Sequence, residues 1–438
     1  MKGDKIISLT LILLLSLVLV GCLEANAASN KVKLTIYKLG KGEITPKVGT
    51  HTYKQGATIT LKAVAKKGYS FNKWSSKGIN ELNKKVKNCE LVLDQDLTIT
   101  AVFSDGKTLN FVDYDIEQVL RKKLQKWGKL NQHSNNILKE DVYGVKSLNI
   151  EGVEIESFQG LQFMPDLNYL DIRESKVTGN LFPLAKSNNL RQLIIREKTK
   201  LKDISQLDLL TQLKDLTLEN HQLTELSQIS NLSQLSRLNI SSSSLKSIKG
   251  IENFTKLKRF TLQNGKVADI STLSQLTNLK RITINDLPVK DISPLSNLNN
   301  LKYLTLSELP VDESKDLTKV LKSMNNLKRL SLTDLKINRV DFLKGISQLS
   351  WLNLSRNSFS NLEKLKEHIL RINNLSTLWL SQLGLENIDF LLKLDLNELK
   401  EVYIRGNNLD LSKEAEDMKV INKLKQKGVQ VIYKWPWQ

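Results

Sequence analysis

The chain has little cysteine and little histidine, on which disulfides and many metal and catalytic sites depend. Its 438 residues include only two cysteines, Cys22 and Cys89, so no disulfide framework is available. We interpret Cys89 as a small buried apolar residue. The four histidines are scattered along the chain: His51, His133, His221 and His368. Without a nucleophile–base pair, a metal-spaced cluster or a phosphate loop, the sequence predicts a protein that is not an enzyme and uses no cofactor or metal.

A long apolar run occurs only at the N-terminus. Residues 6–20 are apolar except for two serines and one threonine, and Lys2 and Lys5 precede them. This pattern is typical of a secretory signal and is too short for a comfortable membrane span. It ends in Leu19-Val20-Gly21-Cys22, which resembles a bacterial lipobox.

The lipobox resemblance implies a membrane-attached protein. Residues 1–21 would be a lipoprotein signal peptide, Cys22 would be diacylated on its sulfur, and residues 22–30 would be a lipid-anchored linker. The protein would then be held at the outer face of the cell membrane of a Gram-positive bacterium. Because no C-terminal sorting signal or apolar tail is present, attachment would depend on Cys22. The alternative is ordinary cleavage after Ala27, which would release a soluble protein.

Positive charge is the strongest bias in the composition. Lysine and arginine number 65 against 46 aspartates and glutamates, which gives a formal net charge of +19. Such a surface favours anionic partners, including acidic proteins, anionic polysaccharides, teichoic acids and a membrane face. Nucleic acid would fit the charge in principle, but we expect none. The alternative is that the lysines only keep the surface solvated.

A repeat of 22 residues organises the centre of the chain. At this spacing a leucine begins each copy of the same sequence motif, and these leucines are Leu213, Leu235, Leu257, Leu279 and Leu301. In the unit from Leu279, apolar residues follow at Ile282 and Ile284, and then at Ile292, Leu295 and Leu298. A period of about 20–29 residues that carries L-x-x-L-x-L is characteristic of a leucine-rich repeat solenoid. The signal is strong because many apolar positions recur in phase.

The spacing also predicts the geometry of each unit. Apolar residues two apart describe a short strand with one buried face, and those three apart suit a 3₁₀ turn. Residues 145–411 therefore predict an α/β solenoid, a leucine-rich repeat horseshoe with a parallel concave sheet and 3₁₀ or short helices on the convex side. We count twelve units, which open at Val145, Leu167, Leu190, Leu213, Leu235, Leu257, Leu279, Leu301, Leu327, Leu349, Leu375 and Leu399.

Longer units and a terminal cap modify this pattern. The units from Leu301 and Leu349 have 26 residues, and four more residues add about one helical turn. We predict genuine helices at 312–324 and 362–372. Residues 412–438 are expected to form a C-terminal cap with a helix over 412–427 and a strand over 429–433.

A small all-β domain is predicted at residues 31–105. Val32–Ile36, Ala57–Leu61 and Leu97–Phe103 alternate apolar and polar residues between Gly, Pro, Asn and Asp punctuation. Phrases such as Gly68-Tyr69-Ser70-Phe71-Asn72-Lys73-Trp74 resemble the divergent internalin B-type repeat of bacterial surface proteins. The resemblance implies a spacer or adhesion module. We expect Tyr69, Phe71 and Trp74 to lie in its core.

Residues 106–144 are predicted to form a helical N-terminal cap, which a solenoid needs to keep its end leucines out of water. Ile116, Val119, Leu120 and Leu124 recur at three and four residues, and Gly128 can end that helix. A second short helix is expected around residues 138–142.

The cap and the repeats resemble internalins over residues 110–434. The resemblance rests on Asn110-Phe111-Val112-Asp113 before the helix and on Asp291-Ile292-Ser293-Pro294-Leu295 in the repeats. One departure concerns the position that usually holds Asn and bonds backbone amides between coils. It is Asn only at Asn357 and Asn407, which predicts that apolar packing replaces most of the ladder. The other residues there are Leu287, Leu309, Leu335, Leu383, His221 and Ser243.

The candidate binding residues lie at the strand positions that point away from the leucine core. Stacking turns each position into a column, with a basic strip in the middle of the solenoid and aromatic residues near its end. Exposed Trp, Tyr and Arg dominate protein–protein hot spots. The alternative is that each Trp packs on its neighbours and the cations serve solubility. The concave candidates are Arg237, Arg259, Arg281, Tyr303, Arg329, Trp351, Trp379 and Tyr403.

These features predict a non-enzymatic bacterial cell-surface binding protein, an internalin-like adhesin or interaction module. Its ligand would be a protein on a host or bacterial surface. The alternative is a cell-envelope module that binds teichoic acid or another anionic glycan, because aromatic rings can also stack on sugars. A structural spacer without a ligand is a third class.

Overall fold

The computed structural model describes residues 31–76, 88–131, 136–196, 198–201, 204–219, 222–311 and 317–435. Two compact units emerge, one formed by residues up to 114 with 127–141 and the other by residues 115–126 with 142–438. The predicted cap, 106–144, is thus divided between them. The predicted signal peptide, Cys22 and the linker lie outside the described residues. No helix in the described ranges has the length and apolar character needed to cross a membrane.

The first unit is the expected small β domain. One four-stranded sheet has the order β3-β1-β7-β5 and a three-stranded sheet has the order β2-β4-β6. Trp74 and Phe103 are fully buried between them, and Phe71 packs 5.6 Å from Trp74, so these aromatics belong to the core. The strands are β1 (Lys31–Leu39), β2 (Gly42–Thr45), β3 (Gly49–Lys54), β4 (Ala57–Ala65), β5 (Ser70–Ser76), β6 (Asn88–Leu93) and β7 (Leu97–Ser104).

The prediction of a second short helix around residues 138–142 is wrong. Strand β9 (Ile137–Leu138) pairs antiparallel with β8 (Thr108–Leu109), and turns follow it. The reason is that the Asp141 carboxylate accepts the backbone N–H of Leu138 at 2.7 Å, which closes a turn where a helix would have to propagate. The first predicted helix is confirmed as α2 (Tyr114–Lys126), with Ile116, Leu120 and Leu124 fully buried.

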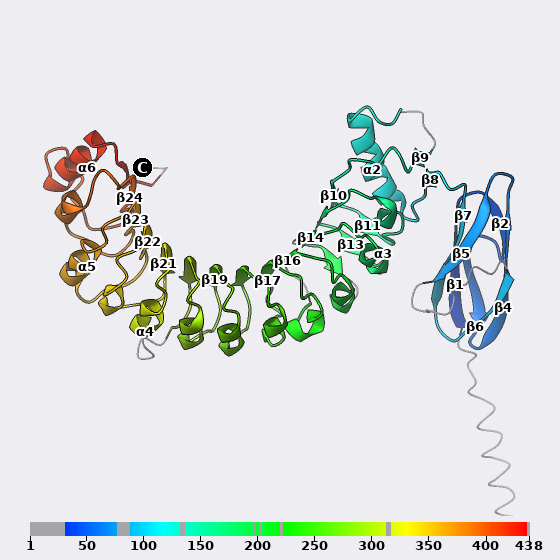
Figure 1. The fold of residues 1–438 in the computed structure, drawn as a ribbon, viewed down its shortest axis with the longest axis horizontal. Helices are drawn as coiled ribbons and strands as arrows, with labels where there is room; N and C mark the ends of the chain where they lie inside the picture. Colours follow the sequence, from blue (N-terminus) through cyan, green and yellow to red (C-terminus); the bar gives the residue numbers. More distant parts are fainter. Residues whose placement is uncertain are drawn as a thin grey trace, which may run out of the picture. The chain divides into compact units, whose positions relative to one another are not determined.

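The second unit is built on one sheet of thirteen strands, all parallel and in chain order (Figure 1). Twelve strands follow the twelve predicted openings, and the last is the strand of the C-terminal cap. The opening apolar residues are buried because each packs against the next coil. The strands are β10 (Ser147–Glu151), β12 (Tyr169–Arg173), β14 (Gln192–Ile195), β16 (Asp215–Glu219), β17 (Arg237–Ser241), β18 (Arg259–Gln263), β19 (Arg281–Asn285), β20 (Tyr303–Ser307), β21 (Arg329–Thr333), β22 (Trp351–Asn353), β23 (Thr377–Trp379), β24 (Glu401–Tyr403) and β25 (Gln430–Ile432).

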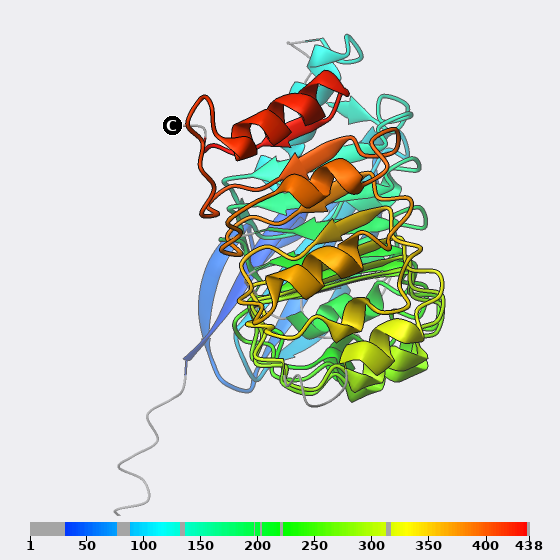
Figure 2. The same ribbon diagram turned by 90° about the vertical axis from the view of Figure 1, so that its left-hand side faces the viewer.

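Short helices cover the convex side of this unit. In Figure 2 the red α6 and the yellow-to-orange helices before it face the viewer on the outer side of the arc. Three two-residue strands, β11 (Glu154–Ile155), β13 (Lys176–Val177) and β15 (Lys200–Leu201), join the first coils. The helices are η2 (Leu161–Phe163), α3 (Phe182–Ala185), η3 (Ile204–Leu209), η4 (Leu226–Ile229), η5 (Ile251–Asn253), η6 (Ser271–Gln275), η7 (Ser293–Asn297), α4 (Leu317–Lys322), η9 (Asp341–Leu343), α5 (Leu362–Ile369), η10 (Asp389–Lys393) and α6 (Glu416–Gln426).

The predicted helices of the long units and of the cap are present but shorter. The helix expected at 312–324 corresponds to α4, although residues 312–316 lie outside the described part, and that expected at 362–372 corresponds to α5. The cap helix starts at Glu416 rather than residue 412, because the Asp410 carboxylate accepts the backbone N–H of Ser412 in a turn.

Side-chain amides join the coils at two different positions. Asn357 accepts the backbone N–H groups of Leu335 and Ile337 and donates to the carbonyls of Leu332 and Leu354, and Asn407 does the same one coil pair later. At the equivalent positions Leu287, Leu309, Leu335 and Leu383 are buried, as predicted, whereas Ser243 is exposed and takes no part in that packing.

The sequence analysis did not identify a second row of side-chain amides that join neighbouring coils. The residue before the opening leucine is Asn278, Asn300 or Asn326 in three successive units, and each side chain donates to a carbonyl of the preceding coil at 2.9 to 3.0 Å. The signal was visible, since these asparagines recur with the leucines they precede. Together the two rows fix the stacking from which the concave columns follow.

Candidate ligand-binding face

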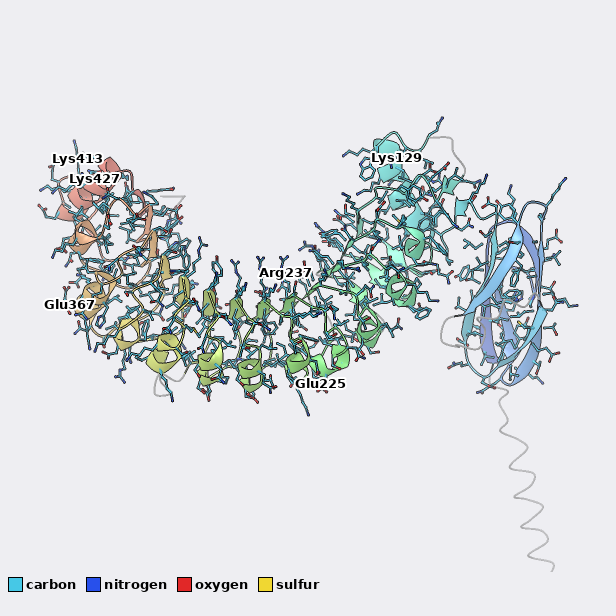
Figure 3. The ribbon with its side chains drawn as sticks, in the orientation of Figure 1. Lys129, Glu225, Arg237, Glu367, Lys413 and Lys427 are labelled. Carbon is cyan, nitrogen blue, oxygen red and sulfur yellow. The ribbon has the colours of Figure 1, made fainter. Side chains whose placement is uncertain are left out.

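The strand register aligns the predicted columns. Arg237, Arg259, Arg281, Tyr303 and Arg329 are successive partners, followed by Trp351. Because neighbouring residues of a strand alternate between faces, these side chains project away from the buried leucines. Figure 3 shows Arg237 on the inner side of the arc and Glu225 and Glu367 on its outer side. In the next column Trp379 follows Asn353 and precedes Tyr403.

In the first third of the concave face, arginines form ion pairs with neighbouring aspartates. The fully buried Asp171 carboxylate accepts from the Tyr169 hydroxyl and from the guanidinium groups of Arg173 and Arg196, the shortest of these bonds being 2.6 Å to Arg173. Burial opposes ionisation of Asp171, but these hydrogen bonds and the two cations outweigh it and hold the pKa of Asp171 below its usual value. Arg237 also lies 3.7 Å from Asp215. The arginines on these strands are therefore engaged by neighbouring carboxylates.

Replacing Asp171 by Asn should destabilise the second unit by about 2–3 kcal/mol. The change removes the charge that balances two arginines, which can still reach water through their exposed 40% and 37%. Since the pKa of Asp171 is lowered on folding, its stabilisation is complete above the unfolded value of about 3.9 and is lost as the pH falls through the folded value. Urea unfolding of Asp171→Asn should therefore show a smaller loss of stability on acidification than the wild type. An equal acid dependence of the two proteins would contradict the role of this carboxylate.

The middle third carries cations without acidic partners, and we call it the cationic strip. Arg259, Arg281 and Arg329 are exposed, and no ion pair among the described residues includes them. The Arg281 guanidinium lies 4.3 Å from the centre of the Tyr303 ring. The lysine that precedes each strand here is also exposed. The strip comprises Lys258, Arg259, Lys280, Arg281, Lys302, Lys328 and Arg329.

The last third carries an aromatic cluster formed by Trp351, Trp379 and Tyr403. Trp379 and Tyr403 stack with ring centres 3.8 Å apart and planes inclined by 22°, and Trp351 lies 6.0 Å from Trp379 at 45°. The guanidinium of Arg329 lies 5.9 Å from the centre of the Trp351 ring. All three rings are partly exposed, so the predicted phase of the leucines is confirmed, and part of each ring is also covered by its neighbours. Burial and the negative charge of Glu401 raise the pKa of Tyr403 above its usual value.

Two further residues lie beside the aromatic cluster, and the sequence analysis did not select either of them. Arg405 follows β24, and its guanidinium lies 5.4 Å from the centre of the Trp435 ring. The sequence could not predict the direction of Trp435, because the C-terminal cap carries no repeat phase from which a direction could be inferred. Thr377, in contrast, completes the arginine column but is buried between coils, so it contributes little accessible surface.

The histidines do not assemble a catalytic site within the described residues. His51 lies on β3 of the first unit and His368 is buried on the convex helix α5, whereas His133 and His221 lie outside the described part. Burial, together with the charges of Arg371, Lys344 and Lys364, lowers the pKa of His368, so a neutral packing role fits it. The described residues also contain no group of three His, Cys, Asp or Glu side chains that could hold a metal ion.

Comparison with known proteins gives matches for both units. Residues 32–107 match the family described as the divergent InlB B-repeat domain. The crystal structure of an internalin (InlF) from Listeria monocytogenes is 26% identical, with a TM-score of 0.58 over 74% of this chain and 88% of that one. A leucine-rich repeat protein of Leptospira interrogans is 18% identical, with a TM-score of 0.51 over 72% of this chain and 98% of that one, and shows the fold alone. The search of curated proteins finds no match.

These matches confirm both resemblances that the sequence indicated. The predicted β module at 31–105 coincides with the matched residues 32–107, and the solenoid has the leucine-rich repeat fold of the solved structures. Solenoids of this fold present extended concave surfaces that are suited to binding other macromolecules. The chain is therefore an internalin-like leucine-rich repeat protein with a divergent InlB B-repeat domain at its N-terminal side.

Proposed function

We propose that this chain is a non-enzymatic bacterial cell-surface binding protein, an internalin-like adhesin or interaction module, whose concave face recognises an acidic protein ligand. The cationic strip attracts the ligand, and the aromatic cluster supplies apolar area that is removed from water on binding. Attachment to the membrane through a lipid on Cys22 is part of the proposal. The observation that carries it is the change along one sheet from paired charges to unpaired cations and then to partly exposed rings.

The geometry of the rings favours a protein over a sugar as the ligand. Sugars bind aromatic residues by stacking on a ring face. Trp379 and Tyr403 cover one face of each other, and Arg329 lies over one face of Trp351. The cluster therefore offers fewer free ring faces than three separate rings would, and its ring edges suit the apolar side chains of a protein hot spot. The unpaired cations still suit an anionic glycan such as teichoic acid, which remains the second candidate.

Dependence on salt should separate the two candidates. A pull-down with residues 28–438 from host-cell and envelope extracts would supply the ligand, and its Kd would then be measured across ionic strengths. For a protein ligand anchored on the rings we expect affinity to fall about tenfold or less between 50 and 200 mM salt. For a polyanion that neutralises six or more cations we expect a loss of about 10³ or more. The steeper dependence would contradict a protein ligand.

A further inference from the structure

A row of acidic side chains borders the cationic strip on the other side of the concave sheet. In the units from Leu279, Leu301 and Leu327 the residue seven positions after the leucine is Asp286, Glu308 or Asp334. We call these three the carboxylate rim. Each lies just beyond its strand, whereas the strip residues lie at the strand's start. Asp286 is six positions after Lys280 in the sequence, which corresponds to about 20 Å along an extended chain.

In neighbouring coils, side chains at this position contact an adjacent coil. One coil earlier, the Asn264 amide donates to the hydroxyl of Ser241, the last concave residue of β17. One coil later, Arg356 lies 4.0 Å from Asp334 and donates to Gln382. Asp286 and Glu308 take part in no ion pair among the described residues, so their charges remain available.

Backbone requirements explain at most one of the two unpaired acidic residues. Asp286 and Glu308 have φ values of 51° and 52°, in the left-handed region that Gly, Asn and Asp adopt more easily than other residues, so this backbone suits Asp286 but not Glu308. Equivalent coils do use Asn264 and Gly406 there. What the fold needs is the backbone N–H, which donates to Ser307 from Asp286 and to Thr333 from Glu308. Any side chain would leave those bonds in place, and glutamate is among the less suitable.

We propose that Asp286 and Glu308 are specificity residues that make the concave face bipolar and reject uniform polyanions. The inference rests on the proposed function and names its partner class, a protein surface with acidic groups opposite the cationic strip and neutral or basic groups opposite the rim. A uniform polyanion that crosses the sheet meets repulsion at the rim, whereas an amphoteric protein surface does not. Specificity of this kind depends on the repulsive element as much as on the attractive one.

The test measures binding of the purified protein to poly-L-glutamate, a uniform polyanion, at about 50 mM salt, where screening is weak. We expect Asp286→Asn/Glu308→Gln to bind about threefold more tightly than the wild type. The control Glu367→Gln/Glu386→Gln changes net charge equally at exposed sites away from the strip, with Glu367 on the outer side of the arc (Figure 3), and it should bind like the wild type. Arg259→Ser/Arg281→Ser should bind more weakly.

Two outcomes would overturn the inference. If both carboxylate pairs raise affinity equally, or neither does, the location of Asp286 and Glu308 is irrelevant. If Arg259→Ser/Arg281→Ser binds as the wild type does, the polyanion does not use the strip and the rim cannot exclude it. Neither outcome depends on the aromatic cluster. The proposed function is tested separately by replacing Trp351 and Trp379 with Ala, as described in the Discussion.

Discussion

The double variant Trp351→Ala/Trp379→Ala should bind the protein ligand at least about 100-fold more weakly while the solenoid stays folded. Hot-spot tryptophans typically contribute about 2–4 kcal/mol each, and 100-fold corresponds to about 2.7 kcal/mol. The two rings are in contact and act as a unit, so we do not expect their effects to add. The loss should appear mainly as faster dissociation in surface plasmon resonance.

The fold should survive because both rings project from the side of the sheet opposite the leucine core. Removing them abolishes the stacking of Trp379 on Tyr403, which costs about 1 kcal/mol beyond the area lost. Circular dichroism should therefore be unchanged. Phe182→Ala, a truncation of a 44% exposed ring on the convex α3, is the matched control and should bind normally. Wild-type affinity in the double variant would remove the proposed binding surface.

Replacing Asn357 by Ala should destabilise the C-terminal coils by about 3–5 kcal/mol. The Asn357 side chain is 3% exposed, and four buried backbone groups depend on it. Two are the N–H groups of Leu335 and Ile337 and two are the carbonyls of Leu332 and Leu354. Each buried group left without a partner costs about 1–3 kcal/mol, and alanine satisfies none of them.

Hydrogen exchange is the appropriate measurement, because the coils of a solenoid open locally rather than all together. The amides of Leu335 and Ile337 should exchange much faster in Asn357→Ala, whereas those of β16 and β17 should keep their protection. Asn300→Ala serves as the control. Its exposed amide makes one 3.0 Å bond to the Thr277 carbonyl, so a loss of about 1 kcal/mol or less is expected. Comparable losses in the two variants would contradict the role assigned to burial.

The arrangement of the solenoid was encoded in the sequence at short range. A leucine that recurs every 22 residues and apolar residues two and three apart determine strand, turn and core face within each unit. Stacking then follows because one unit cannot bury its own leucines. For the same reason the direction of Trp351 and Trp379 could be predicted from their phase alone, and the register confirms it. The β module could be predicted from its alternating apolar and polar residues and from its sequence motifs.

Contacts between coils were decided only by the tertiary structure. The sequence could align Arg259, Arg281 and Arg329, but not that Asp171 and Asp215 pair with the arginines near them and leave those three unpaired. The sequence could place Trp379 and Tyr403 in one column, but it could not show that one face of each ring stacks on the other. A repeat period fixes where a side chain begins and toward which face it points. Where its end comes to rest depends on neighbours some 22 residues away, which no local pattern records.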